Sequence, residues 1–310
     1  MAFWSRSKPE QRDPEFDFLT AQQGARFREL ARATFAEAGV EVIPHAQHLE
    51  ASDGRQFGLW NLAAQCAQAP RGERQWREIV SAHVATTLRG IEGPAVADLS
   101  DDEVLANVYL RVMGHTTLPP DWRQWYSYAR PLAGDLIELL ALDLPDTVTL
   151  LGDEDVTRIG EERLREAGRR NLLRSPVESY EVAGEPGAGA LHLVEGESFF
   201  TASKLLELGH LLQATWGKRD LPYGVVVSVP IRHMVAFHPI EGVDVLDAVQ
   251  RLTGLTASMF NDTPGGVSPF VYWWRDGELT QISAFDDEDK LQVLVDGELS
   301  DVLNELSARS

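Results

Sequence analysis

The sequence predicts an α+β fold, with largely antiparallel sheets and covering helices, and three observations support this class. Residues 223–239 (YGVVVSVPIRHMVAFHP) contain two short apolar runs rich in β-branched residues, which are typical of strands. Pro230 marks the end of the first strand, because proline cannot donate a hydrogen bond to a neighbouring strand. Elsewhere, apolar residues recur at helical spacing, and Asp-Gly pairs indicate turns. Two adjacent strands this apolar favour the middle of a sheet with a helix on at least one face.

The first part of the chain is expected to alternate helices with short strands. Apolar residues from Phe27 to Ala38 share one helical face, and Gly39 supplies a stop. Asp53-Gly54 is the turn signal between the first two strands. The expected elements are a helix ending at Gly39, strands 40–43 and 56–60, helices 61–67 and 76–91, and strands 108–113, 136–142 and 147–151.

The second part is expected to contain longer helices and a sheet built around residues 223–239. The helix at 201–216 has the most regular apolar face, and Gly217 closes it. Asp276-Gly277 indicates a late hairpin. The expected elements are helix 160–173, strands 177–182 and 190–194, helix 201–216, strands 225–229 and 234–237, a helix from 244, strands 270–274 and 278–282, and helix 298–306.

Five arginines surround the apolar face of the helix at 160–173. Glutamates lie within a turn of them in the same helix, and such pairs are typical of a solvated helical face. We therefore interpret these arginines as surface residues paired with Glu161, Glu162 and Glu166. The arginines are Arg163, Arg165, Arg169, Arg170 and Arg174.

Three regions are expected along the chain. Residues 1–17 are predicted to form a flexible arm in which Phe3 and Trp4 are the only anchors. An N-terminal α+β half at 18–150 and a C-terminal α+β half at 151–310 follow. The order helix, two strands, helix, strands occurs in both, so two similar halves are one interpretation.

Composition limits the classes of partner. The 310-residue chain carries 28 basic and 48 acidic side chains, a formal charge of −20. A surface this acidic repels phosphate backbones and anionic lipid, so we expect neither nucleic acid nor a membrane as partner, and a basic protein is favoured. The absence of an apolar leader and of any apolar run of about 18 residues indicates a cytoplasmic protein. Cys66 is the single cysteine, which excludes an intramolecular disulfide.

Histidines offer two weak pairs. His233 and His238 are five residues apart, which places them on opposite faces of an unbroken strand. His45 and His48 follow Pro44 and would converge in a turn, with Glu50 or Asp53 as a third ligand. A catalytic zinc needs three converging protein ligands and supporting hydrogen bonds, which sequence alone does not establish. We therefore predict no metal, no cofactor and no identified catalytic residue.

Aromatic residues are the most distinctive candidates for binding. Trp273 and Trp274 are adjacent in a predicted strand, so their side chains point to opposite faces of the sheet. Trp122, Trp125 and Tyr126 lie in a segment framed by prolines, which disfavours regular sheet. Exposed tryptophans on an acidic surface are typical of protein-binding patches, so we expect at least two of these five rings to be exposed. The alternative is that each ring packs in the core of the protein itself.

Four segments resemble the YtpQ-like family of uncharacterised bacterial proteins, mainly from about residue 129 onward. They are EAGRRNL (166–172), FFTASKLLE (199–207), GVVVSVPIRHMVAF (224–237) and WWRDGEL (273–279). In the first part, only GLWNL (58–62) and the order of elements are similar. The resemblance implies an α+β protein from a bacterium and carries no active site, substrate or cofactor.

Two functional hypotheses follow. The first is a non-enzymatic cytoplasmic protein that binds another protein through an exposed aromatic patch. The second is a hydrolase that uses His233 or His238 with a nearby carboxylate. They differ in what the surface should show, because an enzyme needs a pocket where polar groups converge and a binding module needs an apolar patch or groove.

Overall fold

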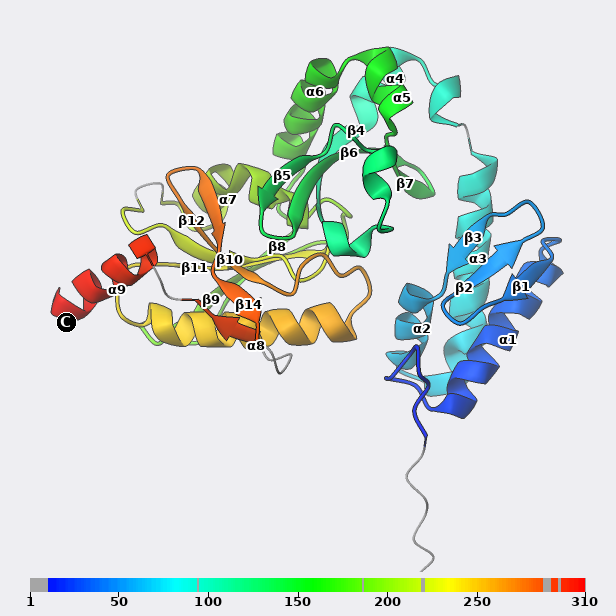
Figure 1. The fold of residues 1–310 in the computed structure, drawn as a ribbon, viewed down its shortest axis with the longest axis horizontal. Helices are drawn as coiled ribbons and strands as arrows, with labels where there is room; N and C mark the ends of the chain where they lie inside the picture. Colours follow the sequence, from blue (N-terminus) through cyan, green and yellow to red (C-terminus); the bar gives the residue numbers. More distant parts are fainter. Residues whose placement is uncertain are drawn as a thin grey trace, which may run out of the picture. The chain divides into compact units, whose positions relative to one another are not determined.

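The structure, a computed structural model, describes residues 11–93, 95–185, 187–218, 221–286, 291–294 and 297–309. The chain forms two compact units (Figure 1). The first comprises Met1–Gly93 with Asp262–Pro264, and the second comprises Pro94–Asn261 with Gly265–Ser310. The expected division at residue 150 instead falls inside the second unit. The reason is that the strands before that position pack against the helix that follows it.

The first unit is a small antiparallel sheet packed with three helices. Its sheet has the order β1-β2-β3, and Leu49 of β2 is fully buried against the helices. Phe27 and Trp76 pack edge to face in the same core. Its elements are α1 (Ala21–Glu37), β1 (Val42–Pro44), β2 (His48–Ala51), β3 (Gln56–Gly58), α2 (Trp60–Ala67) and α3 (Trp76–Glu92).

The segment expected to be a flexible arm is packed from residue 11 onward. Asp13 and Phe16 are buried, and Arg28 donates two hydrogen bonds to the Asp13 carboxylate, at 2.8 and 2.9 Å. These bonds lower the pKa of Asp13 to about 2. The prediction of a free arm is therefore wrong for residues 11–17, because an aromatic ring and an ion pair anchor them. Phe3 and Trp4 lie outside the described residues.

The second unit begins with a sheet in which β6 is central. β6 pairs antiparallel with β4, β5 and β7. Leu140 and Leu142 of β6 are fully buried and share a core with Leu164 of α6. The elements are α4 (Asp101–Asn107), β4 (Val108–Gly114), β5 (Arg130–Ala133), β6 (Leu136–Leu144), β7 (Thr147–Leu150), α5 (Asp153–Ile159) and α6 (Glu161–Arg174).

A six-stranded antiparallel sheet completes the second unit, with β10 at its centre. The order is β13-β12-β10-β11-β9-β8. The strands are β8 (Ser179–Ala183), β9 (Leu191–Glu195), β10 (Val225–Ser228), β11 (Met234–Pro239), β12 (Val271–Arg275) and β13 (Glu278–Gln281). The predicted hairpin is confirmed, and Asp276 and Gly277 turn the chain with positive φ angles of 52° and 87°.

Both faces of this sheet are covered. Val226 faces α8 (Val245–Asp262) and α9 (Gly297–Arg309), and α8 lies along the sheet in Figure 1. Val225, Val227 and Val229 pack on the other face, with α7 (Leu208–Thr215) and residues of β4 and β6. These four valines have no exposed surface, as predicted for an internal strand. β14 (Ser283–Phe285) and β15 (Leu291–Val293) form a separate pair.

Two expectations differ from the structure, namely one continuous helix at 201–216 and two similar halves. Residues 201–216 form a 3-10 helix, Ala202–Glu207, and then α7, because the backbone at Glu207 leaves helical geometry (φ −122°, ψ 41°). The recurring order of elements also does not correspond to a recurring arrangement. The early strands divide between two sheets, whereas β8–β11 share one sheet. The α+β class itself is confirmed.

Candidate functional site

A surface groove beside Trp274 is the candidate site in the second unit. Three adjoining hollows form it, with volumes of about 470, 250 and 430 Å³. The first and second share Leu173, Glu207 and His210, and the first and third share Trp274. We call these hollows together the Trp274 groove. Its walls come from α6, the 3-10 helix Ala202–Glu207, α7, β5 and the β12–β13 hairpin.

The charge of the groove differs from that of the chain. Four basic and two acidic side chains line it, a local charge of +2 on a chain of −20. Its floor is apolar, with Leu173, Leu212 and Leu221 beside the Trp274 ring. The basic residues are Arg169, Arg174, Lys204 and Lys218, and the acidic ones are Glu207 and Glu278. The groove therefore offers apolar surface together with cationic groups.

Some of these charges already have partners. Arg169 pairs with Glu207 through two hydrogen bonds, which raise the pKa of Arg169. Lys218 lies 2.5 Å from Glu241 and 4.2 Å from the centre of the Trp216 ring. Both of these basic side chains remain more than half exposed. A carboxylate entering the groove would exchange one exposed ion pair for another, so its charge contributes mainly to orientation.

Lys204 is the least expected charged residue of the groove. Its side chain is buried, and the Nζ atom donates to the Ser175 backbone oxygen at 2.8 Å and to Ser175 Oγ at 2.6 Å. Burial lowers its pKa, and the nearby Glu178 charge opposes that shift. Ser175 follows the last residue of α6, so Lys204 caps the carbonyl end of that helix. The capped end of α6 thereby forms one wall of the groove.

Sequence reasoning missed the groove residues other than Trp274, although one signal was present. The chain contains only four lysines, and the two within the described residues, Lys204 and Lys218, both line the groove. Within the part of the chain that the structure describes, the other basic residues are arginines, so lysine is found only at this surface. Residues 131–280 contribute to the lining, and this separation along the sequence hides the cluster from local patterns.

The two adjacent tryptophans point to opposite faces of the sheet, as predicted. Trp273 is buried at 7% exposure beneath α8 and α9, and its Nε1 donates to the Tyr223 backbone oxygen at 2.9 Å. Trp274 is half-buried, lies close to Gly209 of α7 and lines the groove. The Trp273 ring fills the core and is therefore not one of the exposed rings that were expected, and its binding role stays a prediction. Trp274 stays a candidate.

The other aromatic cluster is only partly exposed. Trp122 is buried at 6% exposure and packs with Ile137 and Leu139 of β6, so it is not one of the exposed rings that were expected, and its binding role stays a prediction. Tyr126 is half-buried in that cluster, whereas Trp125 is 47% exposed. Only Trp125 of the five rings is largely exposed, which contradicts the expectation of at least two. These residues do not line the Trp274 groove.

The two histidines considered for hydrolysis contact Arg232 or backbone oxygens of neighbouring segments. The His233 ring accepts from Arg232 Nε at 2.9 Å and lies 3.1 Å from the Gly196 backbone oxygen. His238 Nδ1 lies 2.8 Å from the Ala190 oxygen, and its buried Nε2 is 4.0 Å from Asp244 Oδ2. A carboxylate is therefore near His238. Neither histidine lines the groove.

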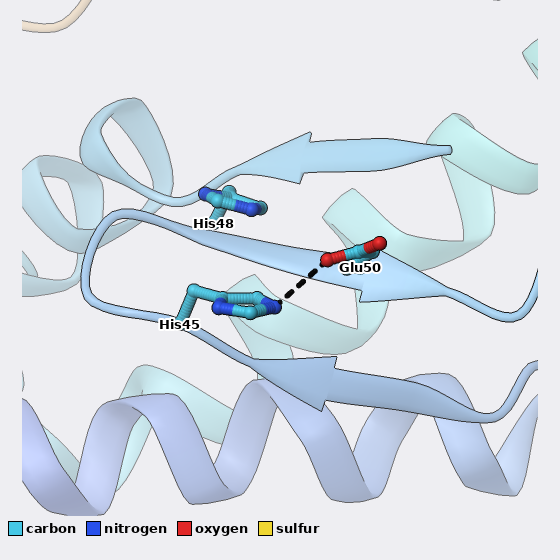
Figure 2. Close-up of side chains that lie close together, drawn as sticks. All are labelled: His45, His48 and Glu50. Atoms are coloured by element: carbon cyan, nitrogen blue, oxygen red, sulfur yellow. Dashed lines mark ion pairs between the residues drawn. The ribbon is translucent and has the colours of Figure 1, made fainter. Parts of the chain in front are cut away.

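The alternative metal ligands do come together in the first unit. His45, His48 and Glu50 each offer a ligand atom, and these atoms lie within 4.8 Å of one another. Figure 2 shows the two imidazole rings face to face beside the Glu50 carboxylate, with centroids 4.6 Å apart. His45 Nε2 is 2.9 Å from Glu50 Oε2. Asp53, the other oxygen considered from the sequence, pairs with Arg55 instead.

A buried carboxyl group joins the four-stranded and the six-stranded sheet of the second unit. Asp135 Oδ1 accepts hydrogen bonds from Ser268 Oγ, at 2.9 Å, and from the Tyr272 hydroxyl. Asp135 Oδ2 is buried and has no hydrogen-bond partner among the described residues. Burial raises the pKa of Asp135, and the two hydrogen bonds oppose the shift. Asp135 thus links the start of β6 to β12, but burying its charged carboxylate is electrostatically unfavourable.

This cost predicts a specific pH dependence. Because the pKa of Asp135 is raised in the folded state, its proton stabilises that state below the ordinary value of 3.8, and this contribution is lost as pH rises through the raised value. Asp135→Asn keeps the oxygen acceptor and removes the titration. We expect the free energy of unfolding of the variant to increase relative to wild type as pH rises from the ordinary value of 3.8 through the raised pKa of Asp135.

Urea unfolding at a series of pH values measures this difference. Asp276→Asn serves as a control for loss of a carboxylate at an exposed turn, where the side chain is 89% exposed. A difference between Asp135→Asn and wild type that stays constant, or that decreases with pH, contradicts the prediction.

Comparison with known proteins found no family model, no curated protein and no solved structure that matches this chain. The resemblance to the YtpQ-like proteins therefore stays a prediction. Among the described residues, no helix combines the length and the apolar character needed to cross a membrane.

Proposed function

We propose that this chain is a non-enzymatic cytoplasmic protein that binds a segment of another protein in the Trp274 groove. The observation that carries the proposal is the groove itself: an apolar floor beside a half-buried tryptophan, edged by basic side chains on an acidic chain. Tryptophan and arginine are the side chains enriched among residues that dominate protein interfaces.

The shape of the groove favours an extended segment over an enclosed small molecule. Three adjoining hollows follow one another past Glu207 and Trp274 and are open to solvent. Small-molecule sites, by contrast, are concave pockets that bury most of the ligand surface. An extended chain can place successive side chains in successive hollows.

The lining also defines the chemistry of the segment. Apolar side chains would pack on Leu173, Leu221 and Trp274, and a carboxylate would lie near Arg174 or Lys218. This differs from the basic partner favoured by composition alone. The charge of the groove itself determines which partner is favoured, because charges beyond about 8 Å are largely screened at physiological ionic strength.

The hydrolase hypothesis has less support. His238 has a carboxylate 4.0 Å away, but neither it nor His233 lines the groove. Lys204 and Ser175 are hydrogen-bonded to each other in the groove, yet Ser175 Oγ also donates to the Leu172 oxygen at the carbonyl end of α6. That end of a helix disfavours a developing oxyanion.

Selection from a displayed library of random peptides tests the proposal. The wild-type chain should enrich peptides that combine apolar and acidic residues. Trp274→Ala should weaken the binding of the enriched peptides by about thirtyfold, corresponding to a contribution of about 2 kcal/mol. Lys218→Glu, which alters an exposed side chain, should weaken peptides that contain a carboxylate.

Trp125→Ala is the matched control, because it removes an exposed tryptophan outside the groove. We expect it to bind selected peptides like wild type. Equal binding by all variants, or loss of binding only in Trp125→Ala, would place the interaction elsewhere. Thermal unfolding of each variant separates loss of binding from loss of folding.

A further inference from the structure

Three side chains with metal-ligating atoms meet on one face of the β1–β2 hairpin in the first unit. Leu49 is fully buried between His48 and Glu50, so strand alternation places those two side chains together on the opposite face. His45 joins them from the turn, where its backbone N–H donates to the His48 oxygen at 2.8 Å. The antiparallel register sets Ile43 opposite Glu50, which brings the start of the turn beside that carboxylate.

The turn that carries His45 is itself fixed. Arg28 Nε of α1 donates to the Ala46 oxygen at 2.9 Å, and Gln47 Nε2 donates to Glu15 at 2.6 Å. The Leu59 backbone N–H donates to the Gln47 oxygen at 2.8 Å. Bonds from three separate segments thus hold the backbone between the two histidines. Such support fixes the backbone from which the ligand side chains extend before any ion binds.

The spacing fits a small coordination sphere. Ligand atoms about 2.0–2.2 Å from a tetrahedral zinc lie about 3.4 Å from one another. His45 Nε2 and Glu50 Oε2 are already 2.9 Å apart, and all three ligand atoms lie within 4.8 Å. The His45 and Glu50 side chains are 42% and 41% exposed, so they can rotate toward an ion without repacking the core. The structure supplies the convergence that sequence alone could not establish.

We propose that His45, His48 and Glu50 bind one divalent transition-metal ion of the zinc class. Two imidazole nitrogens and one carboxylate oxygen suit Zn²⁺, Co²⁺ or Ni²⁺, whereas Mg²⁺ and Ca²⁺ prefer all-oxygen sites. Three protein ligands leave a coordination position for water or for a further ligand. Without the ion, His45 Nε2 and Glu50 Oε2 contact each other at 2.9 Å, so a bound ion must replace that contact. The site lies in the first unit and is independent of the Trp274 groove.

The proposal is tested by titrating Zn²⁺ into the full-length chain after chelator treatment and measuring the heat by calorimetry. We expect about one Zn²⁺ per chain and no comparable heat from Mg²⁺. His45→Ala, His48→Ala and Glu50→Gln should each weaken Zn²⁺ binding at least about tenfold.

His210→Ala is the control, since it removes an exposed histidine from the second unit. It should bind Zn²⁺ at the hairpin like wild type. Zn²⁺ should also raise the thermal unfolding midpoint of wild type and of His210→Ala but not of Glu50→Gln, which keeps the size and hydrogen-bonding capacity of the side chain. Equal Zn²⁺ affinity in wild type and the three ligand variants, or loss of binding in His210→Ala alone, would overturn the site.

Discussion

Val227→Asp is expected to abolish the accumulation of folded protein. Val227 has no exposed surface and lies on β10, between Phe237 of β11 and Tyr272 of β12. Its side chain packs in the apolar cluster beneath α7. A carboxylate placed there costs about 3–5 kcal/mol or more, against a total stability of about 5–15 kcal/mol for a typical domain.

The edge of the same sheet provides a matched control. Val182 lies on β8, the terminal strand, and is 48% exposed. Val182→Asp therefore introduces the same charge into the same sheet where water reaches it, and we expect a change within about 0.5 kcal/mol. Soluble yield and the urea midpoint measure both variants. A Val227→Asp protein with the wild-type midpoint would show that β10 does not organise the core.

The central sheet was predictable because its signals are local. The β-branched runs at Val225 and Met234 and the Asp276-Gly277 turn each define their elements within a few residues. The break at Glu207 was not predictable in the same way. An apolar stripe of period 3.6 continues through residues 201–216, and the sequence pattern does not register a local change from 3-10 to α geometry.

The candidate sites depended more on tertiary packing. Trp122 is buried against β6 and Trp273 beneath α8 and α9, and their local proline and strand contexts do not reveal these contacts. His45, His48 and Glu50 lie within six residues, so their proximity was open to sequence reasoning. Their convergence, however, depends on the register of β1 with β2. A shift of one residue would move His48 and Glu50 to the buried face.

The arginines of α6 form pairs of two kinds, those that local spacing in the sequence predicts and those that depend on tertiary packing. Arg170 pairs with Glu166 one turn away at 3.1 Å, as predicted for a solvated face. Arg163 and Arg169 pair instead with Asp101 and Glu207, outside the helix. Arg165 differs most from the predicted solvated face, because its side chain is only 8% exposed. Intrahelical spacing finds the Arg170–Glu166 and Arg165–Glu161 pairs and cannot find the partners outside the helix.

Arg165 has three acceptors, and two of them, Glu138 and Tyr128, lie outside α6. It forms an ion pair with Glu138 of β6, donates to Glu161 Oε1 at 2.8 Å and donates to the Tyr128 oxygen at 2.7 Å. Glu138 is itself only 13% exposed. Burial lowers the pKa of Arg165 to about 10, so it stays charged at neutral pH. Removing the arginine alone would leave the Glu138 carboxylate buried and without its main partner.

We therefore expect Arg165→Met to lower the free energy of unfolding by about 3–5 kcal/mol. Arg165→Met with Glu138→Leu should recover most of that loss, because apolar side chains of similar size replace both charges. Arg170→Met, which breaks an exposed pair on the same helix, should change stability by no more than about 0.5 kcal/mol. Urea unfolding of the three variants measures these differences. A double variant as unstable as Arg165→Met would show that lost packing, rather than the unpaired Glu138 charge, causes the effect.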